Sequence, residues 1–231
     1  MIGAMVPPPR DESELALRAL ALRGCSVDLL AARWGVHVAG AGVSTKGKVG
    51  ELIERALGAT GGSAAVWDFP ELRTELKTIP IDERGVPRES TFVCTLPLLD
   101  AERIEWETSW VRAKLARTLW IPIVLRADGS RVVGDPRFWS PTIEEERVLA
   151  GDFEEIVGRI GLGDVERVSA RVGRWLQLRP KAAHGGVRTR APGEDGETVW
   201  TVPRGFYLRA RFTRTILGGG LPPLLSERAT R

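Results

Sequence analysis

The sequence has few cysteines and no long apolar run. Only two cysteines occur among 231 residues, and Cys94 stands in the apolar segment TFVCTLPLL, where we expect a buried free thiol rather than a disulfide with Cys25. No apolar run approaches the roughly 20 residues that cross a bilayer, and the start MIGAMVPPPRDESE lacks the basic and apolar regions of an export signal. These absences favour the cytoplasm.

Histidine is equally scarce, and this excludes several kinds of active site. His37 and His184 are too few and too far apart for a histidine-cysteine metal site. No Ser/His/Asp arrangement has positional support. The glycine pairs lack the strand-loop-helix setting of a phosphate-binding loop, so turns are the better interpretation.

The length, with 43% hydrophobic and 27% charged residues, is typical of a globular protein with a sizeable core. The charge is unevenly distributed. Residues 1–165 carry 20 Lys/Arg against 25 Asp/Glu, whereas residues 166–231 carry 13 against 5. A segment with such an excess of cations is typical of a nucleic-acid-binding face, although charge runs are more often plain solvated surface.

The apolar spacing predicts a mixed α/β chain. Helices are expected over 12–25, 26–35, 48–59, 107–118, 140–160 and 205–217, and strands over 74–80, 90–99, 119–126, 174–180 and 197–203. Eight tryptophans are scattered and mostly flanked by apolar residues, so we expect most of them in the core. We find no internal repeat and no clear linker, which favours two lobes of one domain.

One strand carries a candidate catalytic motif. In WDFPELRTELKTIP, side chains two apart on a strand share a face, so Glu75 and Lys77 project together, with Asp68 seven residues before Glu75. Mg²⁺ prefers oxygen ligands, which the two carboxylates and the Leu76 carbonyl supply, and Lys77 would orient an attacking water. As a bare pattern, however, an acid followed by x-Lys is more often a solvated strand face.

Two further residues are candidates for the same site. On the helix KVGELIERALGA, Glu51 lies opposite the apolar face, whereas Glu54 lies at its edge and is able to point into a cleft. Lys114 in WVRAKLART adds a second amine. Each is also an ordinary surface residue of an amphipathic helix.

A resemblance extends over roughly residues 45–215. The chain resembles the MutH family of DNA mismatch-repair endonucleases in the ordered segments TKGKVGELIERALGA, WDFPELRTELKTIPID, GVPRESTFVCTLPL, WETSWVRAKLARTLWIP, VERVSARVGRWLQLRPKAA and TVPRGFYL. The resemblance implies a restriction-endonuclease-like α/β fold, a mixed sheet flanked by helices with two arms around a DNA cleft. It also implies a monomer that uses Mg²⁺ to nick the unmethylated strand at hemimethylated GATC, activated by the mismatch-repair protein MutL.

The resemblance assigns roles by position. Asp68, Glu75 and Lys77 fall on the family's catalytic motif, Glu54 on its helix-borne acid that supports the metal, and Lys114 on its additional active-site lysine. The metal position is expected to take Mg²⁺ and to accept Mn²⁺ or Ca²⁺ in its place. The family positions that approach DNA are matched by Lys46, Phe92, Arg179, Pro180, Lys181 and Tyr207.

The chemistry of these DNA-facing residues agrees with the resemblance. A guanidinium such as that of Arg179 is able to read guanine O6 and N7, and an aromatic wedge such as Phe92 is able to enter from the minor groove. Tyr207, the only tyrosine, falls on the family's methylation sensor, although without the resemblance a core aromatic is the first interpretation. Five arginines are weaker candidates for phosphate contacts: Arg188, Arg190, Arg209, Arg211 and Arg214.

We therefore expect one endonuclease domain over residues 1–231. Within it, 1–12 form a leader, approximately 13–150 a catalytic arm and approximately 151–231 a basic DNA-recognition arm. Two alternatives remain open: a restriction-type nuclease that cuts both strands, and a catalytically inactive DNA-binding module.

Overall fold

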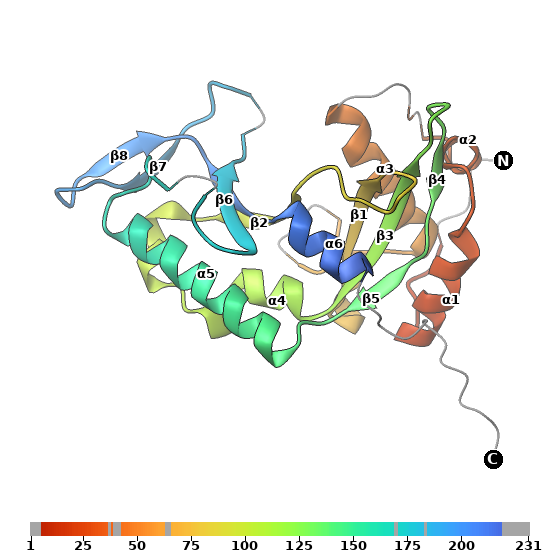
Figure 1. The fold of residues 1–231 in the computed structure, drawn as a ribbon, viewed down its shortest axis with the longest axis horizontal. Helices are drawn as coiled ribbons and strands as arrows, with labels where there is room; N and C mark the ends of the chain where they lie inside the picture. Colours follow the sequence, from red (N-terminus) through yellow and green to blue (C-terminus); the bar gives the residue numbers. More distant parts are fainter. Residues whose placement is uncertain are drawn as a thin grey trace, which may run out of the picture. The chain divides into compact units, whose positions relative to one another are not determined.

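The computed structural model describes residues 6–36, 38, 43–62, 66–168, 171–182 and 184–218. Its contacts divide the chain into two compact units, shown in Figure 1. Unit 1 comprises Met1–Arg88, Arg117–Trp139 and Arg214–Arg231, and unit 2 comprises Glu89–Ala116 and Ser140–Thr213. The units interleave along the chain, whereas the arms expected from the sequence met near residue 150. Composition along a chain cannot reveal interleaving, because strand pairing between distant segments creates it.

Three helices of unit 1 form where apolar spacing predicted them: α1 (Glu12–Leu22), α2 (Val27–Trp34) and α3 (Val43–Leu57). Asp11 caps α1 by accepting from the backbone N–H of Glu14, at 2.8 Å. Gly35 ends α2 in the left-handed conformation, with φ of 64°. The three helices bury one apolar cluster with the sheet of this unit.

The sheet of unit 1 is mixed. β1 (Glu75–Ile81) runs parallel to β3 (Thr118–Leu125), and the short strands β4 (Arg131–Val133) and β5 (Arg137–Trp139) pair antiparallel with β3. β3 is central and its first six residues are all buried. β1 and β3 were predicted; β4 and β5 were not, because three residues are too few to show an alternation.

Unit 2 holds a three-stranded antiparallel sheet, in the order β2 (Thr91–Leu96), β9 (Arg204–Leu208), β6 (Leu176–Pro180). A separate hairpin joins β7 (Thr189–Pro192) to β8 (Thr198–Thr201). The other elements are α4 (Trp110–Ala116), α5 (Ile143–Gly161), and the 3₁₀ helices η2 (Leu98–Arg103) and η3 (Trp106–Thr108). α6 (Ala210–Gly218) begins in this unit.

One secondary-structure prediction was wrong. The helix expected over 205–217 is a strand, β9, followed by the shorter α6. Phe206 and Leu208 are buried while Tyr207 between them is half-buried, which is the alternation of a strand. The spacing of apolar residues in 209–217 is helical and led to the prediction of one long helix. Pairing with β2 on one edge and β6 on the other makes residues 204–208 a strand instead. Among the described residues, no helix is long and apolar enough to span a membrane.

Candidate functional site

A tight hairpin in unit 1 explains the spacing of Asp68 and Glu75. Phe69 and Thr74 exchange backbone hydrogen bonds of 3.0 and 3.2 Å across it. Its turn contains η1 (Pro70–Leu72) and Arg73, whose φ of 47° makes it the one non-glycine residue with positive φ in the described part of the chain. Since Phe69 pairs with Thr74, the next pair outward is Asp68 and Glu75. The interval of seven residues between Asp68 and Glu75 is therefore the length of chain that this turn requires.

Asp68 is held in place through both its backbone and its side chain. The backbone N–H of Leu76 donates to Asp68 Oδ2 at 2.7 Å, and the N–H groups of Thr60 and Gly61 donate to the Asp68 carbonyl at 3.0 and 3.1 Å. A Cβ at Gly61 would lie 2.1 Å from the Trp67 carbonyl oxygen, so only glycine permits this approach. Asp68 is 9% exposed.

Glu75 and Lys77 share one face of β1 and pair directly. Lys77 Nζ lies 2.6 Å from Glu75 Oε1, with the side chains 15% and 3% exposed. The backbone N–H of Glu75 donates toward β3, to the Arg117 carbonyl. Because neighbouring residues of a strand direct their backbone groups to opposite edges, the Leu76 carbonyl lies on the edge where Asp68 accepts. Carboxylate and carbonyl oxygens therefore meet along this edge of β1.

Glu54 on α3 is electrostatically part of the same group. Burial, and then the Asp68 carboxylate, raise the pKa of Glu54 to about 7, while Lys77 acts in the opposite direction. A Cβ at Gly50 would lie 3.6 Å from Thr78 Oγ1 and 3.9 Å from Glu54 Oε1, which shows how closely α3 approaches β1. Glu51 is exposed and pairs with Arg55 at 2.5 Å. The different orientations predicted for the two acids are confirmed.

The donor set fits a hard divalent cation. Three carboxylates stand against one lysine in a partly buried setting, and the raised pKa of Glu54 reflects burial first and then the nearby Asp68 carboxylate. Within the described ranges, no group of three or more His, Cys, Asp or Glu side chains is arranged as a ready metal site. Mg²⁺ does not require one, since it is usually held by one or two carboxylates and otherwise by water and substrate oxygens.

Unit 2 gathers four of the predicted DNA-facing side chains. Phe92 on β2 and Tyr207 on β9 are opposite in register, and their rings make an edge contact with centroids 5.3 Å apart. The Arg179 guanidinium lies 5.5 Å from the Tyr207 ring, and Lys181 Nζ lies 4.6 Å from the Phe92 ring. Two aromatic rings and two cations thus form one group, which we call the aromatic-cation cluster.

The backbone makes room for this cluster. A Cβ at Gly205 would lie 2.8 Å from both Phe92 Cε2 and the Cys94 carbonyl oxygen, so the Phe92 ring occupies the space of a missing side chain. Arg179 Nη1 also donates to Ser90 Oγ at 2.5 Å. Burial raises the pKa of Tyr207, and Arg179 acts in the opposite direction. The phenol therefore stays protonated and keeps both its donor and its acceptor.

The remaining predicted residues are placed less fully. Pro180 ends β6 in the exposed part of that strand, beside Lys181, whose backbone N–H donates to the Pro203 carbonyl at 2.7 Å. Lys114 belongs to unit 2, on α4, with Nζ 5.5 Å from the Trp110 ring. Its role as an active-site lysine stays a prediction. The side chain of Lys46 lies outside the described residues.

Comparisons with known proteins show where the chain belongs. The family model described as "DNA mismatch repair enzyme MutH" matches residues 57–152. The "DNA mismatch repair protein MutH" of Serratia proteamaculans is 47% identical over 94% of this chain and 96% of its own length. The same protein of Citrobacter koseri is 47% identical over 92% and 94%, and that of Escherichia coli 45% over 92% and 94%. The chain belongs to the MutH family.

Membership in the MutH family makes this protein a DNA mismatch-repair endonuclease, and hence a nuclease that binds DNA. Its mixed sheet with flanking helices is the restriction-endonuclease-like α/β fold expected from the sequence. The family match covers both the Asp68 hairpin of unit 1 and the β2 strand of unit 2. The roles of individual residues remain predictions from their positions.

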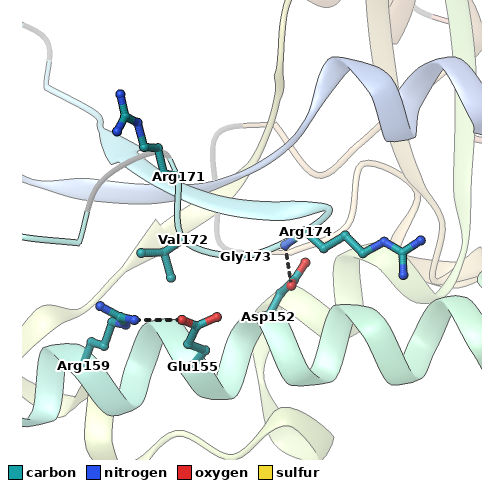
Figure 2. A pocket seen from close by; sticks show the side chains of 7 residues that line it. All are labelled: Asp152, Glu155, Arg159, Arg171, Val172, Gly173 and Arg174. Carbon is teal, nitrogen blue, oxygen red and sulfur yellow. Dashed lines mark hydrogen bonds and ion pairs between the residues drawn. The ribbon is translucent and has the colours of Figure 1, made fainter.

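The sequence analysis missed a residue that holds β6, the strand of this MutH-family protein that carries the predicted DNA-facing Arg179 and Pro180. Asp152 is 6% exposed and accepts from the backbone N–H groups of Arg174, Trp175 and Leu176 at 2.6, 2.6 and 2.8 Å. It lies beside an open pocket of about 530 Å³ between α5 and this segment, shown in Figure 2. The available signal was an acid on the apolar face of α5, one residue before the buried Phe153.

Two arginines proposed for phosphate contacts serve the same segment. Arg209 Nη2 donates to the carbonyls of Val172 and Gly173 at 3.1 and 2.8 Å. Arg211 Nη2 donates to the Arg174 carbonyl at 2.5 Å. They were considered for DNA binding because they lie in the basic last part of the chain. These contacts show that at least part of each guanidinium binds the chain itself.

Proposed function

We propose that the protein uses Mg²⁺ to nick the unmethylated strand of hemimethylated GATC sites, and that MutL activates it. The observation that carries this proposal is the assembly of Asp68, Glu75 and Lys77 by one hairpin, with Glu54 coupled to it. Carboxylates that are able to hold a divalent cation, together with an amine beside them, are side chains suited to metal-assisted phosphodiester hydrolysis. The family membership supplies the DNA substrate.

Asp68, Glu75 and the Leu76 carbonyl would hold the metal, with Glu54 in support, and Mn²⁺ or Ca²⁺ would fit the same oxygen donors. When bound, the ion polarises the phosphoryl group and lowers the pKa of a bound water. Lys77, held by Glu75 at 2.6 Å, would orient the attacking water and offset charge that develops on phosphate oxygens. Glu54, with its pKa raised to about 7, is able to exchange a proton near neutral pH.

Recognition would fall to the aromatic-cation cluster. The Arg179 guanidinium is able to contact guanine O6 and N7 as a bidentate pair, and Pro180 and Lys181 continue the same loop. The Tyr207 hydroxyl would accept from an unmethylated adenine N6 and clash with a methyl group. Phe92 would insert from the minor groove, and Lys46 would contact DNA from unit 1. Lys114 is proposed as the second lysine of the active site.

The proposal includes a monomer in the cytoplasm. A nick in one strand needs one active site, which one chain supplies. Cys25 and Cys94 form no disulfide, which suits a reducing compartment. Activation by MutL is supported by the family membership alone.

The test is strand-resolved cleavage of a circular DNA with one GATC site. The site is prepared unmethylated, hemimethylated in each orientation and fully methylated, with Mg²⁺, and each form is assayed with and without MutL. We expect nicks only in unmethylated strands, more of them with MutL, and none above background for Lys77→Ala.

Each alternative predicts a different pattern in this assay. Simultaneous cuts in both strands, indifferent to methylation, would support a restriction-type nuclease. Binding without metal-dependent scission under any condition would support an inactive DNA-binding module. Nicking that does not depend on methylation but is stimulated by MutL would support the mismatch-repair endonuclease and contradict the proposed role of Tyr207 in sensing methylation.

A further inference from the structure

The β7–β8 hairpin of unit 2 presents two faces of opposite character. Ala191 and Thr201 lie on its inner face, 0% and 4% exposed. On the outer face Arg190 and Trp200 are directly opposite each other in register. Both are exposed, and Trp200 is 69% exposed. All eight tryptophans lie in described ranges, and Trp200 is the only one in the exposed class.

Neither side chain of this pair is used within the described part of the chain. The Arg190 guanidinium and the Trp200 ring have no hydrogen bond, ion pair or ring contact with any described residue. Among the five arginines considered for phosphate contacts, Arg209 and Arg211 bind carbonyls near β6, and Arg188 binds those of Gly185 and Val187. Arg190, on this hairpin, differs from these three arginines because its guanidinium binds no carbonyl of the described chain.

The charge around the pair favours an anionic partner. Residues 167–193 contain seven Arg or Lys and no Asp or Glu. Acids reappear only at the hairpin tip, and they are directed elsewhere. Glu194 pairs with Arg167 at 3.1 Å, and Glu197 accepts from the backbone N–H of Asp195 at 3.0 Å. The outer face thus combines a cation with an exposed aromatic ring and carries no acid of its own.

We propose that the outer face of the β7–β8 hairpin binds the DNA backbone beside the recognition site. Arg190 would contact a phosphate, and Trp200 would pack on the neighbouring deoxyribose. A two-stranded ribbon is narrow enough to lie along a groove of duplex DNA. This inference rests on the proposed function and extends its footprint, because β6 and Lys181 lead directly into the hairpin.

The length of chain limits the position of this contact. Nine residue steps separate Lys181 from Arg190, and at about 3.3 Å per step they reach at most ~30 Å. At 3.4 Å per base pair along a strand, this corresponds to no more than ~9 base pairs. A flank of about 12 base pairs is therefore long enough to include the proposed contact, whereas a flank of about 3 base pairs removes most of the duplex within this reach.

The experiment compares two duplexes, each with one hemimethylated GATC, with flanks of about 3 or about 12 base pairs. Binding is measured as a function of salt in a Lys77→Ala background, so that the DNA stays intact. One phosphate contact contributes a slope of ~0.9 in log affinity against log salt, or about 8-fold at 0.1 M salt. We expect the long duplex to bind about 8-fold tighter or more.

Arg190→Gln should abolish most of this gain and reduce the salt slope on the long duplex by about 1. Trp200→Ala should reduce the gain without changing the slope, because its contact is uncharged. Arg33→Gln, the same change at an exposed residue of α2 in unit 1, serves as the control and should keep the full gain. Each protein is compared with itself on two duplexes, so a partly unfolded variant does not distort the ratio.

An equal gain from long flanks in the parent and in both variants would overturn the inference. So would the absence of any gain in the Lys77→Ala parent, even while the protein that keeps Lys77 nicks GATC. If the variants keep the gain in the binding assay, but the same substitutions in the protein that keeps Lys77 abolish stimulation of nicking by MutL, the face binds a protein and not DNA. Failure of the parent in the cleavage assay would instead count against the proposed function, and with it this extension.

Discussion

The two candidate sites carry opposite excesses of charge, acidic in unit 1 and basic in unit 2. In unit 1, the buried carboxylates of Asp68 and Glu75 and the adjacent Glu54 stand against a single lysine, and burial, together with the Asp68 carboxylate, raises the pKa of Glu54 to about 7. On the sheet of unit 2, cations lie over the rings of Phe92 and Tyr207. One site is completed by a cation and the other by an anion. Mg²⁺ would complete the first site and the phosphates of DNA the second.

The units also differ in how their sites are assembled. Asp68, Glu75 and Lys77 lie within ten residues, and one hairpin sets their geometry. Phe92, Arg179 and Tyr207 come from three strands far apart in sequence. The first site depends on one turn, whereas the second depends on the register of a whole sheet. Substitutions should therefore separate turnover from recognition.

The largest effect should come from Glu75→Gln in unit 1. The change keeps the size of the side chain but removes the charge that holds Lys77 and would bind Mg²⁺. We expect nicking to fall by about 10³-fold, since loss of metal polarisation costs several kcal/mol. Binding of a GATC duplex, measured in parallel, should change by no more than a few-fold. A comparable loss of binding would show that the units do not divide the work.

Asp152→Ala should produce the next largest effect, and in unit 2. The change leaves the backbone N–H groups of residues 174–176 without their acceptor. We expect the free energy of unfolding to fall by about 2–4 kcal/mol in urea titrations. Glu155→Ala, three residues further along α5, removes only an exposed pair with Arg159 and should cost about 0.3–0.5 kcal/mol.

Hydrogen exchange would locate the damage from Asp152→Ala. We expect faster exchange in β6 and β9, with β1 and β3 close to the parent. Equal acceleration in both sheets would mean that Asp152 supports the whole molecule and not the recognition sheet.

The pH dependence of stability should expose the crowded acids of unit 1. The pKa of Glu54 is raised from 4.5 to about 7, so the folded state holds this proton more tightly than the unfolded state. Its contribution is complete below pH 4.5, declines as pH rises, and is lost above about pH 7. In EDTA, the parent should therefore lose roughly 1–3 kcal/mol more than Glu54→Gln between pH 4.5 and 8. Identical losses in both proteins would contradict the raised pKa of Glu54.

Sequence patterns identified the elements of unit 1 well, and the reason is local. The helices α1 to α3 have long apolar faces, and the hairpin around Asp68 is complete within ten residues. The same patterns failed where contacts with segments far apart in the sequence determine the secondary structure. The segment GFYL has both helical and strand character, and only its pairing with β2 and β6 makes it β9.

Buried polar contacts were equally hidden from the sequence. The sequence analysis did not single out Asp152, and it considered Arg209 only as a candidate phosphate contact. Both side chains bind backbone groups just before β6, and no spacing rule reveals these contacts. The family resemblance pointed to Tyr207 and Arg179, but only the structure showed that the Arg179 guanidinium lies over the Tyr207 ring. It also showed that this ring contacts Phe92, for which Gly205 makes room.

The smallest predicted effect comes from removing one hydroxyl group in unit 2. It tests whether recognition is altered separately from catalysis. Tyr207→Phe keeps the ring that packs on Phe92 and lies beside Arg179. It removes the oxygen proposed to accept from unmethylated adenine N6. A hydrogen bond of this kind is worth about 1 kcal/mol, so nicking at unmethylated adenine should fall by about 5- to 10-fold.

Nicking at methylated adenine should not fall with Tyr207→Phe, because that bond is absent there from the start. The ratio of the two rates should therefore narrow by the same factor. Both rates are measured strand by strand on one hemimethylated circle, at enzyme concentrations high enough to detect slow nicking of the methylated strand. An equal fall on both substrates would assign the hydroxyl to positioning the sheet. An unchanged ratio and rate would leave discrimination to the shape of the Tyr207 ring and the cations beside it.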